Sequence, residues 1–208
     1  ASERPSIQSG LNNLPAVHFD GVDDQMLSAN AIKVGTVFSL FNWTGVSPLP
    51  DYNGVMTALG GSNEVFFIGT QGSTSLYSAG YFASQVYVNQ TLTLDLAPLS
   101  NYKILSGVQP SPISTFNGIR LASDRNFGGR FWNGNFLENL VFDTILAPAQ
   151  YTAVYNYLSY KYAPPVDLGP DKIVCSLPIT LKASKNYFTS YTWSNASTAD
   201  SLVISAPG

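Results

Sequence analysis

Three aspartates and the only histidine of the chain lie close together in the segment AVHFDGVDDQML, residues 16–27. Carboxylates beside an imidazole could carry out acid–base catalysis or bind a metal ion. The segment also contains Asp20–Gly21, a strong turn signal, because glycine adopts positive φ and aspartate can accept hydrogen bonds from nearby backbone. A turn whose acids bind backbone N–H groups is therefore the simpler interpretation, with His18 packed on a strand face.

Calcium binding is the more specific chemical hypothesis for this segment. Ca²⁺ takes carboxylate and carbonyl oxygens, which a tight loop and a ligand from elsewhere in the chain can supply together. Asp23 and Asp24 are the loop candidates, and Asp124 or Asn126 would be the distant ligand. The alternatives are a structural Ca²⁺ at these residues and a loop that satisfies only its own backbone.

Catalytic residue sets are scarce in the rest of the chain. No G-x-S-x-G motif is present, so a hydrolase nucleophile has no marker. A glycosidase needs two carboxylates about 5–10 Å apart, but the only glutamates are Glu3, Glu64 and Glu138. Glu138 and Asp143 are five residues apart in a predicted strand, which places them on opposite faces. We predict that the chain is not an enzyme and that Glu138 has a structural role.

Aromatic side chains are better candidates for a ligand surface. Sugar rings stack on Trp and Tyr faces, while amide, carboxylate and guanidinium groups bind their hydroxyls. A predicted turn at 132–135 carries an indole and two amides, and a second aromatic turn contains Tyr52. The candidate ligand-binding residues are Trp132, Asn133, Tyr52, Tyr81 and Arg120. Trp43 ends an apolar strand and is expected in the core.

The composition limits the classes of partner. Charged residues make up 11% of the 208 residues, about half the usual share, and the net charge is −3. No Lys/Arg cluster could neutralise several phosphates, so we expect no nucleic-acid partner. No apolar run approaches the roughly 18 residues of a membrane helix, so we expect no membrane span. The chain has no N-terminal signal sequence, so the signal of a secreted protein would lie upstream.

Most of the chain has the pattern of short β-strands. Runs rich in Val, Ile, Phe, Tyr and Thr are separated by Gly, Pro, Asn, Asp and Ser, which is typical of a β-sandwich. Residues 35–43, GTVFSLFNW, predict a strand that is buried on both faces. Residues 135–143 predict a strand after an Asn133–Gly134 turn, and strict alternation would place Phe136, Glu138, Leu140 and Phe142 on one face.

One segment has the period of a helix instead. In residues 146–163, apolar and aromatic side chains recur at i, i+3, i+4, i+7 and i+11 from Tyr151 onward. Pro148 lies near the first turn, and the Pro164–Pro165 pair ends the helix. We expect this helix to pack on the edge of the sandwich. The composition changes after the two prolines, which predicts two domains, residues 1–163 and residues 164–208.

Two stretches of the first domain resemble a known family. RPSIQSGLNNLPAVHFDGVDDQML (4–27) and NGNFLENLVFDTILAPAQYTAVYNYLSYKYA (133–163) are similar to the opening and closing segments of laminin-G-type domains in bacterial, Bacteroidetes-like surface proteins. The resemblance implies a concanavalin A-like jelly-roll β-sandwich with one late α-helix. The family usually has an earlier aromatic strand before the Arg-Pro pair. It therefore also implies that this chain is a fragment, or that another chain supplies that strand.

The C-terminal region resembles a second family. DLGPDKIVC, ITLKAS and YTWSNASTADSLVISAPG are similar to the PKD-type, immunoglobulin-like repeats of secreted Bacteroidetes proteins. The resemblance implies a partial immunoglobulin-like domain in which Cys175 has lost its disulfide partner. Such a half-finished sandwich would expose an edge and invite strand donation from a neighbouring chain. Thr144 and Ser201 also fit the Asp-Ser/Thr-apolar pattern of O-glycosylation in these bacteria.

These expectations converge on an extracellular, non-catalytic adhesion module. The leading function is binding of glycans or another cell-surface ligand through loop aromatics, within a large secreted surface protein. One alternative is a structural spacer or filament subunit that assembles with neighbouring chains or domains by strand exchange. Another is an accessory carbohydrate-binding module of a multi-domain exported enzyme.

Overall fold

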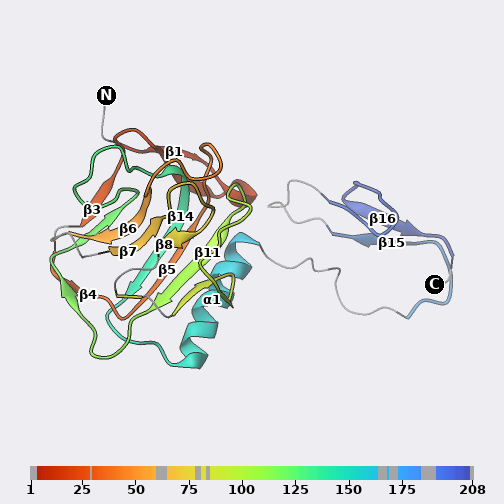
Figure 1. Ribbon diagram of the computed structural model, residues 1–208. Coiled ribbons are helices and arrows are strands. Elements are labelled where there is room, and N and C mark those ends of the chain that lie inside the picture. The colour runs from red at the N-terminus through yellow and green to blue at the C-terminus, as the bar shows by residue number, and fades with distance from the viewer. Residues whose placement is uncertain are drawn as a thin grey trace.

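The protein is an all-β sandwich with one late helix (Figure 1), as the strand pattern predicts. The computed structural model describes residues 4–28, 30–59, 65–77, 81–82, 85–163, 168, 173–183 and 191–206. Among these residues, a seven-stranded sheet has the order β1 (Ser6–Ser9), β2 (Pro15–Asp20), β14 (Asn133–Phe142), β5 (Thr36–Phe41), β11 (Lys103–Val108), β9 (Val86–Val88), β10 (Thr91–Leu92). A short 3₁₀ helix, η1 (Leu11–Asn13), joins β1 to β2.

A five-stranded sheet forms the second layer. Its order is β3 (Met26–Ser28), β13 (Ile119–Leu121), β6 (Gly54–Ala58), β7 (Val65–Gly69), β8 (Leu76–Tyr77). A small ladder pairs β4 (Ile32–Lys33) with β12 (Thr115–Phe116). Every pairing between the described strands is antiparallel. The strand order places segments distant in sequence side by side, as with β2, β14 and β5.

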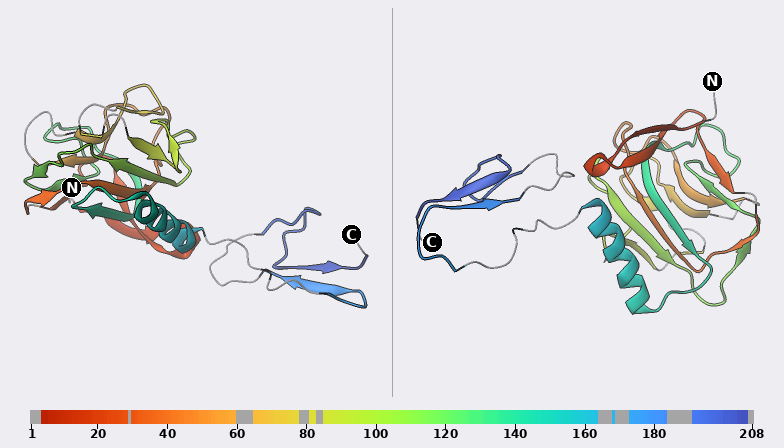
Figure 2. Two further views of the ribbon diagram at one scale, coloured as in Figure 1. Left: turned by 90° about the horizontal axis from the view of Figure 1, so that it is seen from below. Right: turned by 180° about the vertical axis from the view of Figure 1, so that it is seen from behind.

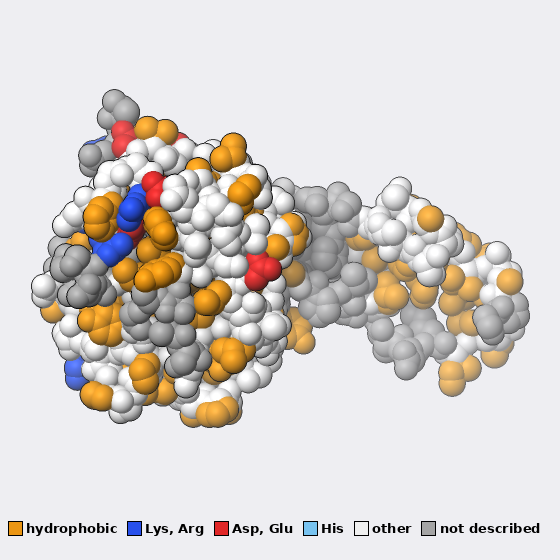
Figure 3. Space-filling view, viewed as in Figure 1, with side chains coloured by type: hydrophobic (Ala, Val, Ile, Leu, Met, Phe, Trp, Pro, Cys, Tyr) orange, Lys and Arg blue, Asp and Glu red, His pale blue; other side chains and the backbone are white. Residues whose placement is uncertain are grey.

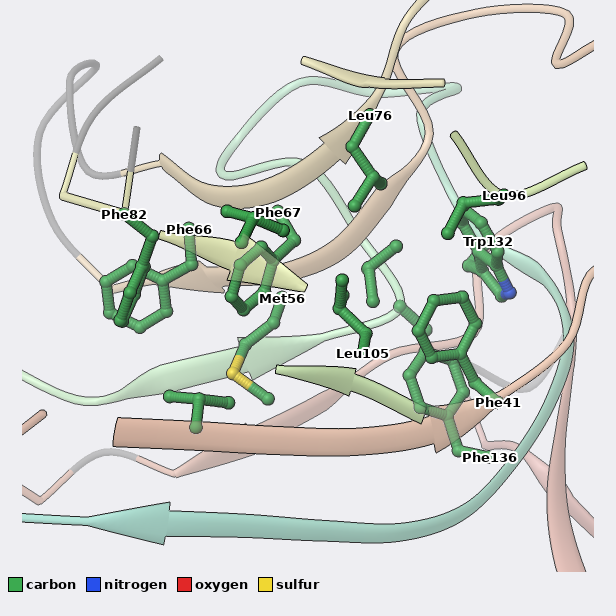
Figure 4. Packing of buried hydrophobic residues seen from close by; sticks show 14 of the residues in the cluster. Phe41, Met56, Phe66, Phe67, Leu76, Phe82, Leu96, Leu105, Trp132 and Phe136 are labelled. Carbon is green, nitrogen blue, oxygen red and sulfur yellow. The ribbon is translucent and has the colours of Figure 1, made fainter. Parts of the chain in front are cut away.

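The main core fills the space between the two sheets. Aromatic rings dominate it, and Figure 4 shows Trp132, Phe41 and Phe136 together at one end. Trp43 is 3% exposed, as expected from its place at the end of an apolar strand, and its indole packs edge-on against Trp132 at 4.9 Å between ring centroids. Such pairs contribute about 0.5–1.5 kcal/mol beyond the area that they bury.

The helix α1 (Pro148–Tyr162) covers the outer face of the seven-stranded sheet and not its edge, which corrects the sequence-based expectation (Figure 2). Leu158 and Tyr162 pack with Phe38 and Leu40 of β5 and Ile104 of β11. Every residue of β5 is buried because the core lies on one side of this strand and the helix lies on the other. The prediction that β5 is buried on both faces is therefore confirmed.

Glu138 joins the sheet to the helix. Its carboxylate accepts hydrogen bonds from Lys161 Nζ at 2.8 Å and Tyr157 Oη at 2.9 Å. Burial alone would raise the pKa of Glu138, but the hydrogen bonds from Lys161 and Tyr157 outweigh it and lower the pKa. The same carboxylate, together with Tyr157, raises the pKa of Lys161. The structural role predicted for Glu138 is consistent with these contacts.

The predicted turn at Asn133–Gly134 is wrong, because both residues lie inside β14 and pair with Asp20 and Phe19 of β2. Gly134 is required by a close approach: a Cβ there would lie 2.1 Å from the backbone oxygen of Asn42. A register shift between Phe136 and Glu138 also breaks the strict alternation of side chains. Phe136 therefore packs in the main core, whereas Leu140 and Phe142 pack toward the helix.

The C-terminal region contributes one described hairpin, β15 (Ile179–Lys182) with β16 (Ser201–Ile204). Among the described strands, these two pair only with each other. Cys175 is exposed, with a free thiol. The predicted boundary at Pro164–Pro165 lies outside the described residues.

Candidate functional site

The acidic segment forms a tight turn at the end of β2. Gly21 has a φ of +77°, and the carboxylate of Asp20 accepts the N–H of Val22 at 2.8 Å. Asp24 Oδ2 accepts the N–H of Asp20 at 3.0 Å, which closes the turn. His18 lies on the strand face beside it, with Nδ1 3.0 Å from Asn135 Oδ1. These acids therefore satisfy their own backbone, as the simpler interpretation predicts.

The same turn brings three carboxylates together. One oxygen from each of Asp20, Asp23 and Asp24 lies within 4.8 Å of the others, and Asp23 Oδ1 is buried without a hydrogen-bond partner. Three converging carboxylate oxygens suit Ca²⁺, which takes six to eight oxygen ligands. Asp20 is the member that sequence reasoning left out. Asp124 is outside this group, because its carboxylate is buried against Arg125 and Arg130.

Asp24 gives the acidic turn a predictable response to pH. Burial raises its pKa, and the neighbouring Asp20 and Asp23 raise it further. The folded state therefore binds this proton more tightly than the unfolded chain, so stability is lost as pH rises through the raised pKa. At pH 7 without calcium, Asp24→Asn is therefore expected to increase the free energy of unfolding. Urea unfolding of parent and variant between pH 4 and 7 measures this difference.

A calcium titration separates the two interpretations of the turn. If the turn binds Ca²⁺, the ion raises the unfolding temperature of the parent but leaves that of Asp24→Asn unchanged. Asp143→Asn is the matched control, because Asp143 is an exposed acid outside the turn. Equal responses of the parent and both variants would show that calcium acts elsewhere.

Trp132, the leading ligand candidate from the sequence, is fully buried, and its assignment to a binding loop is wrong. Its Nε1–H donates to the backbone oxygen of Asn42 at 2.8 Å. Its ring packs edge-on against Phe41 at 5.2 Å and against Trp43 at 4.9 Å. The indole therefore closes one end of the core, since Gly134 leaves room for the chain of Asn42 to pass beside it.

Three other candidates are occupied by structural contacts. Asn133 Oδ1 accepts a hydrogen bond from Thr44 at 2.8 Å. Tyr81 is half-buried, and its ring packs against Phe116 at 4.8 Å. Arg120 donates to Gln25 at 3.0 Å and to Asn126 at 2.8 Å, and burial lowers its pKa. These contacts hold loops to the sandwich.

Tyr52 is the candidate that the structure places in a surface cluster. We name this cluster the Arg130 patch, and it consists of Asp51, Tyr52, Tyr77, Phe127 and Arg130. The side chains of Tyr77 and Phe127 are 46% and 44% exposed. Figure 3 shows a group of basic side chains next to an acidic one, bordered by hydrophobic side chains, over this face of the molecule.

Arg130 organises the patch. Its guanidinium carbon lies 4.6 Å from the ring centre of Phe127 and 5.0 Å from that of Tyr52. Its Nη1 is 3.0 Å from the buried Asp124, and its Nε is 3.5 Å from the partly exposed Asp51. These contacts fix the guanidinium and both rings while leaving Phe127 and Asp51 open to solvent. The patch therefore combines rigid aromatic faces with charged hydrogen-bonding groups.

Sequence reasoning missed most of this patch. Tyr52 was visible as an aromatic turn residue, but Phe127 and Arg130 belong to a loop that carries no motif. The one sequence feature that could have indicated the patch is the segment 124–130, in which charged residues and glycines surround an aromatic residue. That signal does not indicate which distant turn the loop will contact.

The two O-glycosylation candidates differ in their surroundings. Thr144 is exposed just after β14, and its backbone oxygen accepts a hydrogen bond from Thr36 at 3.1 Å. Ser201 is half-buried at the start of β16 and donates to Asp200 at 3.2 Å. Thr144 is therefore the more accessible of the two.

The sequence matches no protein-family model, and searches of the curated proteins and of the solved structures find no match. Among the described residues, no helix has the length and apolar character needed to cross a membrane. The resemblances to laminin-G-type and PKD-type domains therefore remain expectations.

Proposed function

We propose that this chain is a non-catalytic extracellular module that binds glycans through the Arg130 patch. The observation that carries the proposal is the exposed ring of Phe127 on the fixed guanidinium of Arg130, with the accessible carboxylate of Asp51 on that guanidinium and the exposed ring of Tyr77 packed against Tyr52. A sugar ring can stack on the aromatic faces, while Asp51 accepts and Arg130 donates hydrogen bonds to its hydroxyls. The resemblance to a domain type of bacterial surface proteins supports the extracellular location.

The charges of the patch favour neutral sugars. Arg130 is paired with both Asp51 and Asp124, and Arg125 is paired with Asp124 at 2.6 Å. Within these ion pairs, two guanidinium groups balance two carboxylates, so the pairs offer no surplus charge to a sulfated or carboxylated sugar. Neutral hexose oligosaccharides are the proposed ligand class.

A glycan array followed by calorimetry tests the proposal. We expect the parent to bind neutral oligosaccharides, and Phe127→Ala to weaken the best of them by about tenfold, or ~1.4 kcal/mol. Tyr77→Ala should have a similar effect because its exposed ring borders the same surface. Both side chains are largely exposed, so neither substitution should alter the unfolding temperature by more than a few degrees.

Tyr160→Ala is the matched control, because Tyr160 is an exposed aromatic residue, 62% accessible, on α1 and far from the patch in sequence. It should leave glycan affinity unchanged. Absence of binding to every sugar on the array would overturn the proposal, as would equal losses in Phe127→Ala and Tyr160→Ala.

A further inference from the structure

The strand β14 has a partner on both sides along only half of its length. Asn133–Phe136 pairs with β2 on one side, and β5 lies along the other side. Beyond the register shift at Phe136, residues 138–142 pair with β5 alone among the described strands. The strand β2 begins at Pro15, and proline has no N–H with which to extend a ladder.

This half of β14 therefore has an open edge. In an antiparallel strand, alternate residues direct their backbone N–H and C=O groups toward each neighbour, so the edge presents a row of hydrogen-bonding groups. Residues 137–142 are all partly exposed, whereas every residue of β5, the next strand, is buried. The edge sequence ENLVF contains no proline or lysine, and its one charged side chain, Glu138, is hydrogen-bonded to Lys161 of α1.

An apolar pocket lies beside this edge. Its volume is about 270 Å³, and Asn139 and Val141 of β14 form one wall. The opposite wall consists of apolar side chains from β3, β4, β6 and β13. Met26 and Leu27 of β3 line the pocket and are 45% and 55% exposed. Met26 therefore lies at this opening between the sheets.

The edge and the pocket together indicate what kind of polypeptide segment could bind here. A strand that pairs with 138–142 would direct alternate side chains to the same side as Asn139 and Val141, and therefore into the pocket. A cavity of about 150 Å³ accepts benzene, so this larger one has room for two aliphatic side chains. Backbone bonds that provide affinity and a pocket that selects alternate side chains are the two features of strand addition.

We propose that β14 accepts an extended strand from a partner polypeptide, with aliphatic residues at two alternate positions that fill the pocket. No described strand of this chain pairs with residues 138–142 except β5, and we take the occupant to be a segment of another polypeptide. The site is independent of the glycan proposal, because no residue of the Arg130 patch lines the pocket. It gives the expected strand exchange a defined location.

The test uses the whole chain and a synthetic probe. The probe is a peptide of alternating threonine and isoleucine with a lysine at each end. We expect saturable binding by fluorescence anisotropy with a Kd below about 1 mM, and slower hydrogen exchange at the amides of 138–142. One analogue of the peptide is N-methylated on its odd residues and another on its even residues. The two should differ in affinity, because only one set of N–H groups faces β14.

Met26→Lys should weaken binding at least tenfold by placing a charge at the mouth of the pocket. Leu92→Lys is the matched control, since Leu92 is a 62% exposed residue on β10, the far edge strand of the seven-stranded sheet that contains β14. The proposal is overturned if the peptide does not bind, or if exchange slows only at β1 or β10. It is also overturned if the chain alone dimerises with residues 138–142 protected, because a second copy would then cover the edge.

Discussion

Trp132→Ala is expected to lower the free energy of unfolding by about 3–5 kcal/mol, the range for removing a large buried aromatic side chain. The indole is fully buried among aromatic rings, so its loss leaves a cavity that the two sheets cannot close. Its Nε1–H also donates to Asn42, whose backbone oxygen would lose that bond. Urea unfolding followed by tyrosine fluorescence or circular dichroism measures the change.

Trp132→Phe keeps a ring but removes the N–H donor, so a smaller loss of about 1–2 kcal/mol is expected. Glycan affinity, measured at a temperature where each variant is folded, should be unchanged in both. A Trp132→Ala protein as stable as the parent would contradict the buried position. A selective loss of glycan binding without a loss of stability would restore the original assignment to a binding loop.

Asp124→Asn is expected to destabilise the protein by about 2–3 kcal/mol, because it leaves two guanidinium groups without their shared carboxylate. The side chain of Asp124 is fully buried and accepts hydrogen bonds from Arg125 at 2.6 Å and Arg130 at 3.0 Å. The asparagine cannot offer two anionic oxygens, so Arg130 should lose its fixed position. Glycan affinity should fall together with stability, as calorimetry on the folded variant would show.

Asp51→Asn is the matched control for this ion pair. Asp51 also contacts Arg130, but its side chain is 38% exposed and the separation is 3.5 Å. Exposed pairs of this kind contribute little, so a stability change below about 0.5 kcal/mol is expected. Equal losses of stability in Asp51→Asn and Asp124→Asn would show that burial does not determine how much Asp124 stabilises the protein.

Periodicity explains why much of the fold could be predicted. The alternation of residues 35–43 and the helical spacing after Tyr151 depend only on local sequence, and both elements form as expected. The position of the helix was missed, because its apolar stripe indicates that it packs but does not indicate which surface it meets. The register shift in β14 was missed because one extra residue reverses every later side chain without leaving a local signal.

The candidate sites were harder to predict for a related reason. Gly134 was interpreted as a turn residue, yet it is needed where the chain passes close to Asn42. The Arg130 patch combines segments from all three thirds of the sandwich sequence, and no spacing rule connects such residues. The acidic turn was predicted more fully because all three carboxylates come from one short segment.

The strand order has a consequence for biosynthesis. The strand β14 lies between β2 and β5 in the sheet, yet it is the last strand of the sandwich to leave the ribosome. Until then, Phe19 and Phe41 lack Phe136, the ring that packs against both of them. The sandwich therefore cannot close while its nascent chain is incomplete, and long-range pairings of this kind form slowly.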